Sequence, residues 1–160
     1  MNTPSESEDL SPQEYHQRLH RLAIVWGACC ISPILYLAVA AIIKSAFMPE
    51  GGWYPVEPFT WSRIMIGLVV WIILLQILHT AVKLRARHRL STLPAHSSAF
   101  LQLLTRRTFI LIALSEAAVA VGFVLVLLQG EYHPIFLSGI AAMLLYAQSH
   151  PSQALPASAG

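Results

Sequence analysis

The residue whose chemistry most needs explaining is Glu116, which lies near the middle of an apolar run over residues 109–128. A run of about 20 apolar residues is long enough to cross a bilayer as a helix. An ionised carboxylate at that depth costs about 2.5–3.5 kcal/mol. Glu116 is also the only acidic residue inside any long apolar run of this chain. We therefore expect its carboxyl group to be protonated, paired, or turned toward a protein interior.

A polar partner at similar depth is available in Gln76. Gln76 lies seven residues before Lys83, and Glu116 lies nine residues after Arg107. A protonated carboxyl group both donates and accepts hydrogen bonds, as an amide does. One interpretation is a proton- or cation-binding site formed by Glu116 and Gln76. The other is a single interhelical hydrogen bond that only fixes helix packing, worth about 0.6 kcal/mol.

Small residues accompany Glu116 along its run, and they predict a helix-packing face. Small side chains let the backbone of a second helix approach closely, and this set comprises Ala113, Ala117, Ala120 and Gly122. In the first apolar run, Pro33 removes a backbone donor and predicts a kink. That kink serves either helix packing or gating.

Four apolar runs organise the 160-residue chain, at about residues 22–43, 64–82, 109–128 and 132–150. Only 11% of the residues are charged and 56% are hydrophobic, whereas a soluble domain carries about 25% charged residues. We predict an all-α polytopic membrane protein, a bundle of four transmembrane helices over residues 21–150. The fourth run is the weakest, and a buried or re-entrant segment is its alternative. Residues 1–20 are predicted to form a polar tail and residues 151–160 a disordered one.

The segment 83–107 between the second and third runs is basic and predicts the orientation of the bundle. It contains six cationic residues and no acid: Lys83, Arg85, Arg87, Arg89, Arg106 and Arg107. The positive-inside rule places such a loop in the cytoplasm. Both termini are then cytoplasmic, and the protein is a multi-pass protein of the inner (plasma) membrane. Nucleic-acid binding is the alternative for this loop; we favour the topological interpretation and expect no nucleic-acid partner.

No motif in the chain points to an enzyme, a metal or a cofactor. Cys29 and Cys30 are adjacent, and neighbouring helical positions point about 100° apart, so we expect packing residues rather than a disulfide. No CxxC or Cys/His spacing indicates a metal site. No phosphate-binding loop, zinc-helix motif or nucleophile elbow occurs. We therefore predict a protein without catalytic residues, bound metal or cofactor.

The stretch 113–117, Ala-Leu-Ser-Glu-Ala, together with the apolar residues 122–128, resembles the carboxylate-bearing helix of rotary ATP synthase c subunits, the proteolipids. The resemblance covers residues 113–128 and implies that Glu116 binds a transported proton or sodium ion. In sodium-binding members a glutamine on the preceding helix joins the site, and Gln76 occupies a comparable place. The glycine repeat of that preceding helix is missing here, where Gly67 is the only glycine of residues 64–82.

Three hypotheses about function follow. The first is a small accessory or structural subunit that associates with other membrane proteins, or with itself, inside the lipid bilayer. The second is c-subunit-like binding or translocation of a proton or cation at Glu116. The third, and weakest, is a lipid- or quinone-binding cleft near Pro33.

Overall fold

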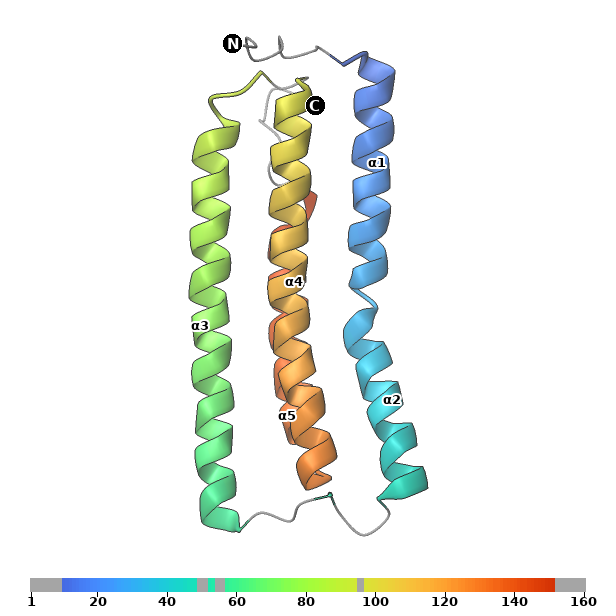
Figure 1. Cartoon of the computed structure of the whole chain (residues 1–160), viewed down its shortest axis with the longest axis vertical. Helices are drawn as coiled ribbons and strands as arrows, with labels where there is room; N and C mark the ends of the chain where they lie inside the picture. The colour runs from blue at the N-terminus through green and yellow to red at the C-terminus, as the bar shows by residue number, and fades with distance from the viewer. Residues whose placement is uncertain (1–9, 49–51, 54–56, 95–96, 152–160) are drawn as a thin grey trace, which may run out of the picture.

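The computed structural model describes residues 10–48, 52–53, 57–94 and 97–151. Within these ranges the chain is helical and contains no β-strand. The elements are α1 (Pro12–Cys29), α2 (Ser32–Phe47), α3 (Pro58–Leu90), α4 (Ser98–Gln129) and α5 (His133–Ser149). Because α2 continues the course of α1, these two helices form one long rod, which runs beside the rods α4 and α3 (Figure 1). The shorter α5 is the fourth rod and packs behind α4 in this view. The predicted all-α class is confirmed.

Three of these rods have the length and composition of membrane spans. The stretches Pro12–Phe47, Thr60–Leu90 and Ser98–Gln129 are long and apolar enough to cross a bilayer. The fourth rod, α5, has 17 residues and is therefore about 25 Å long, slightly less than the hydrocarbon thickness of about 30 Å. Three rods thus have the character of membrane-spanning helices by length and composition, while a complete fourth crossing stays a prediction.

The first rod begins with a strong local signal and is then interrupted. Ser11 caps α1 through a capping box, in which its hydroxyl accepts from the backbone N–H of Glu14 and the Glu14 side chain bonds back to the backbone N–H of Ser11. Such reciprocal caps stabilise a first turn. The rod breaks at Cys30 and Ile31, and α2 begins at Ser32, the residue before Pro33. The predicted kink is thus a short break between two helices. The predicted tail 1–20 is helical in part, because α1 already begins at Pro12. Residues 1–9 of that tail and residues 152–160 of the predicted tail 151–160 lie outside the described residues.

Much of the basic segment 83–107, expected as a loop, is helical. Helix α3 continues to Leu90 and α4 already begins at Ser98. Leu, Arg and Lys all favour helix, so the helical pattern persists beyond the apolar run until residues near Pro94 end it. Ser97 then caps α4 by accepting a hydrogen bond from the N–H of Phe100. The two basic helix ends are consequently held side by side instead of forming a long free loop.

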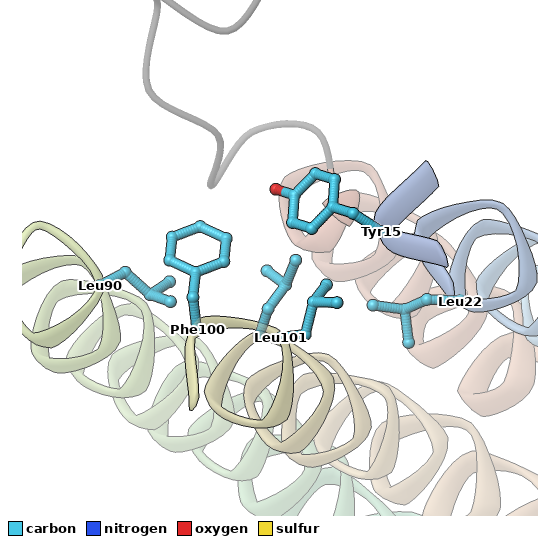
Figure 2. Close-up of a cluster of buried hydrophobic side chains, with 6 residues drawn as sticks. Tyr15, Leu22, Leu90, Phe100 and Leu101 are labelled. Atoms are coloured by element: carbon cyan, nitrogen blue, oxygen red, sulfur yellow. The ribbon is translucent and has the colours of Figure 1, made fainter. Parts of the chain in front are cut away.

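A buried apolar cluster joins three helices at this end of the bundle. It contains Tyr15 and Leu22 of α1, Leu90 of α3, and three residues of α4: Phe100, Leu101 and Leu104. Figure 2 shows the α4 side chains lying between those of α1 and those of α3. Helix α4 therefore connects α1 and α3, whose side chains pack against it from opposite sides.

Helix α4 is the central element of the bundle. In the most apolar 18-residue stretch of α4, 39% of the residues are buried. The corresponding stretches of Pro12–Phe47 and Thr60–Leu90 are only 11% and 17% buried. Helix α5 packs closely on α4 at Gly122, where an added Cβ would lie 2.8 Å from the carbonyl oxygen of Pro134 on α5. The chain reverses between these helices at Gly130, whose φ of 77° is the left-handed conformation that favours glycine.

The predicted small-residue face is divided by the structure. Gly122 is buried against α5, and Ala117 and Ala120 are half-buried, whereas Ala113 is exposed. Ala113 and Gly122 are nine residues apart, which at about 100° per residue places them on opposite sides of the helix. The residues that pack most deeply on α4 include Ser115, Ala118 and Val119.

Candidate functional site

The break in the first rod presents a hydroxyl group to the interior of the bundle. Helix α1 ends in a tightened turn, in which the N–H of Ile31 bonds the carbonyl of Ala28 at 3.3 Å. Pro33 has no N–H, so the carbonyl of Cys29 loses its helical donor. A new helix starts at Ser32. The interruption leaves Ser32 half-buried and free to use its side chain in a contact with another helix.

Glu116 is the acceptor in that contact. The Ser32 hydroxyl donates to Oε1 of Glu116 at 2.5 Å, and the hydroxyl of Tyr146 donates to the same carboxylate oxygen. The two hydroxyl oxygens are themselves 3.4 Å apart. The Oε1 atom of Glu116 on α4 therefore links Ser32 of α2 to Tyr146 of α5. We call Ser32, Glu116 and Tyr146 the carboxyl cluster.

The carboxyl cluster is enclosed by apolar and weakly polar groups. Tyr146 is 1% exposed, and Glu116 is half-buried. The Cys29 thiol lies close enough to interact electrostatically with Glu116, and both cysteines are free and half-buried. Among the described residues, no Lys, Arg or His pairs with Glu116. Its partners are neutral hydroxyl groups, which accept or donate hydrogen bonds but do not neutralise a charge.

Gln76, the partner expected for Glu116, makes a different contact. Its Nε2 donates to Oε1 of Gln148 on α5 at 3.3 Å, so the structure does not bring Gln76 and Glu116 into one hydrogen-bonded site. Gln76 and Glu116 lie at comparable depths, seven residues from Lys83 and nine residues from Arg107. Depth along a helix does not determine the side of α3 from which Gln76 projects. The partners that sequence reasoning missed are Ser32 and Tyr146. The hydroxyl residue next to the predicted kink at Pro33 was the available signal for Ser32.

A second polar contact supports the same part of the bundle. The indole N–H of Trp26 on α1 donates to the Ser149 hydroxyl at 3.1 Å. The Trp26 ring also meets the ring of His150 edge to face, with centroids 4.5 Å apart. These contacts tie the last turn of α5 to α1 and hold Tyr146 one turn away from them.

An apolar cavity lies beside the helix break. It has a volume of about 360 Å³ and is lined by residues of α2 and α5, among them Pro33, Leu37, Gly139 and Met143. Its lining is apolar, as the hypothesis of a lipid or quinone site near Pro33 requires. No titratable side chain contributes to it, so it offers space for an acyl chain or ring without a group that performs chemistry.

The carboxyl cluster offers only oxygen atoms at the point where three helices meet. Oxygen ligands suit a proton or a hard cation and do not suit soft transition metals. In keeping with this donor set, the described residues contain no group of three or more His, Cys, Asp or Glu side chains arranged to hold a metal ion.

Comparison of the chain with protein-family models, with curated proteins and with solved structures gives no match.

Proposed function

We propose that this is a small, non-catalytic integral membrane protein whose function depends on exchangeable binding of a proton or a small cation at Glu116. The observation that supports this proposal is the carboxyl cluster, in which the hydrogen-bond partners of a mid-span glutamate, among the described residues, are neutral hydroxyls of two other helices. The resemblance of residues 113–128 to the c-subunit helix implies the same role for Glu116. In this chain Ser32 and Tyr146 take the place proposed for Gln76.

The charge of the Glu116 carboxyl group determines what it can bind. A carboxylate removed from water is costly unless it is paired, and hydroxyl donors supply hydrogen bonds but no opposite charge. Glu116 is thus expected to carry a proton, or to share its negative charge with a bound cation. Residues at membrane depth that must take up a positive charge in this way commonly mark ion or proton pathways.

The distribution of charge supports an orientation with both termini in the cytoplasm. The end of α3 and the beginning of α4 carry the basic residues, and α1 begins at the same end of the bundle (Figure 1). The positive-inside rule assigns that end to the cytoplasm of a bacterial-type inner membrane.

The outer surface of the bundle supports association with lipid or with further subunits. On α3 large apolar side chains are exposed on several sides, including Val70, Trp71, Leu74 and Ile77. Such surfaces require a bilayer or a neighbouring membrane protein. We therefore propose that the ion-binding unit works as a subunit of a larger membrane complex or of a homo-oligomer.

Labelling with a hydrophobic carbodiimide tests the proposed binding site. This reagent adds to a protonated carboxyl group in an apolar environment, so we expect Glu116 to be modified and the water-exposed Glu131 to be spared. Sodium ions or a raised pH should slow the reaction, because each removes the proton from the reactive oxygen. Mass spectrometry of peptides from the reconstituted protein measures both sites in one sample.

Variants of the cluster make this test specific. Glu116→Gln should abolish the label. Ser32→Ala and Tyr146→Phe should weaken protection by sodium about three- to twentyfold, the factor that corresponds to one interhelical hydrogen bond of about 0.6–1.7 kcal/mol. Tyr36→Phe is the matched control, because Tyr36 packs against Phe123 outside the cluster. Labelling of Glu116 that ignores both pH and sodium would show that the carboxyl group only ties helices together.

A further inference from the structure

Arg107 on α4 is a buried cation with no anionic partner among the described residues. Its side chain is only 2% exposed, although the residue lies at the basic end of the bundle. Its Nε, Nη1 and Nη2 atoms are all buried and have no hydrogen-bond partner among the described residues. A guanidinium group stays charged and carries five N–H donors. Leaving these donors unpaired away from water is strongly unfavourable, so the site requires an acceptor that the described part of the chain does not supply.

The neighbours of Arg107 increase the positive charge instead of balancing it. Arg87 of α3 interacts electrostatically with Arg107. Lys83, one turn earlier on α3, is in range of both arginines. The fully buried His79 lies one further turn along α3 and supplies no negative charge to balance them. Like charges at this distance repel one another. A bound anion would relieve that repulsion and satisfy the Arg107 donors together.

A cavity lies directly beside the Arg107 side chain. It lies between α3 and α4 and has a volume of about 340 Å³. Four arginines line it, namely Arg85, Arg89, Arg106 and Arg107. Arg107 is the buried member of this set, and the other three are exposed around it. Guanidinium groups bind phosphate oxygens through paired N–H donors.

The rest of the cavity lining favours a lipid headgroup over a free anion as the ligand. Between the arginines the wall is apolar and includes Val82 and Ile110. Val82 ends the second apolar run of the sequence, and Ile110 lies at the start of the third. The cavity is therefore at the level where a bilayer changes from hydrocarbon to headgroup. Basic pockets between membrane helices at this level are suited to anionic lipid headgroups.

We propose that this cavity binds the phosphate group of an anionic phospholipid, with Arg107 as the buried ligand and Arg85, Arg89 and Arg106 around its opening. The lipid's acyl chains would continue along the apolar side of α3 and α4. This site is independent of the carboxyl cluster, because Arg107 and Glu116 are nine residues, or about 13 Å, apart along α4.

The test uses the full-length protein in nanodiscs or mixed micelles, with phosphatidylglycerol as the anionic lipid and phosphatidylcholine as the zwitterionic reference. Native mass spectrometry counts the retained lipid, and titration gives its affinity. We expect one phosphatidylglycerol per chain to be retained in preference to phosphatidylcholine. Arg107→Gln should weaken that binding at least about tenfold, since it removes charge-assisted hydrogen bonds.

Two further variants keep the test informative if Arg107→Gln folds poorly. Arg106→Gln changes an exposed residue of the same cavity and should also weaken phosphatidylglycerol binding, by a smaller factor. Arg21→Gln is the matched control, because Arg21 is an exposed arginine of α1 that does not line the cavity. Equal loss of binding in Arg21→Gln and Arg106→Gln would indicate general surface attraction and overturn the proposal.

A measurement of thermal stability distinguishes a bound lipid from a bound free anion. Without anionic lipid, Arg107→Met should be at least as stable as the native chain, because it removes an unpaired buried charge. Adding phosphatidylglycerol should raise the unfolding temperature of the native chain and leave that of Arg107→Met unchanged. Inorganic phosphate should not reproduce this shift. If phosphate alone does reproduce it, or if both lipids stabilise both proteins equally, the assignment to an anionic phospholipid is wrong.

Discussion

Gly122→Leu is expected to disrupt the contact between α4 and α5 and to produce the largest loss of stability among substitutions at the glycines of α4 and α5. An added Cβ at this position would lie 1.9 Å from the hydroxyl oxygen of Ser138 and 2.8 Å from the carbonyl oxygen of Pro134. The backbone of α5 would have to move, because the Pro134 carbonyl cannot rotate away as a side chain can. Overpacking of a tight contact costs about 1–3 kcal/mol or more, and a leucine adds three further carbon atoms beyond Cβ.

Denaturant titration of the protein in mild detergent measures this effect, and the chain provides a matched control. Gly139 lies on α5 next to Ser138, but a Cβ built there meets no atom within 4 Å. Gly139→Leu should therefore unfold close to the native midpoint. The smaller substitution Gly122→Ala should recover part of its loss when combined with Ser138→Gly. Similar midpoints for Gly122→Leu and Gly139→Leu would contradict the close approach of the two helices.

Glu116→Lys is expected to reduce the yield of folded protein by about two orders of magnitude. A charged lysine at the centre of a span costs about 2.5–3.5 kcal/mol on the insertion scale. Because the protonated Glu116 that we propose carries no charge, this cost corresponds to a factor of roughly one hundred between the two proteins. The substitution also removes the oxygen to which Ser32 and Tyr146 donate. An ammonium group has only donors, so it cannot take the place of the carboxyl acceptor.

Glu116→Gln is the appropriate comparison. An amide of the same shape keeps an acceptor oxygen for the two hydroxyls and carries no charge, so the folded yield should stay near that of the native chain. Size-exclusion chromatography of the extracted membranes gives both yields. If lysine is tolerated as well as glutamine, Glu116 projects into water or toward a counter-ion, and the carboxyl cluster does not describe its environment.

The helices and their membrane character were readable from the sequence because both depend on local composition. Apolar runs of about 20 residues have few alternatives to a membrane helix, and Pro33 marked the place of the break. The ends of the helices were less predictable. Arg, Lys and Leu favour helix with or without a bilayer, so hydropathy alone missed the helical continuation of α3 to Leu90 and of α4 back to Ser98.

The partners of Glu116 were not predictable in the same way. Depth along a helix follows from residue counting, but the direction of a side chain depends on how each helix is rotated about its axis. That rotation is determined by contacts such as Gly122 against Ser138, which join residues far apart in the sequence. Gln76 and Glu116 have similar depths and different partners for this reason. The burial of Arg107 depends on the same tertiary packing, because its sequence context matches that of the exposed Arg106.

Infrared spectroscopy of the reconstituted protein observes the protonation of Glu116 itself, through the C=O stretch of a carboxylic acid. The band is assigned to Glu116 by its loss in Glu116→Gln. We expect an acid band in the native protein, shifted in Tyr146→Phe by the lost hydrogen bond and replaced by carboxylate absorption when sodium is added or the pH is raised. A Glu116 that absorbs as a carboxylate under every condition, or an acid band that responds to neither sodium nor pH, would contradict exchangeable binding of a positive charge at this site.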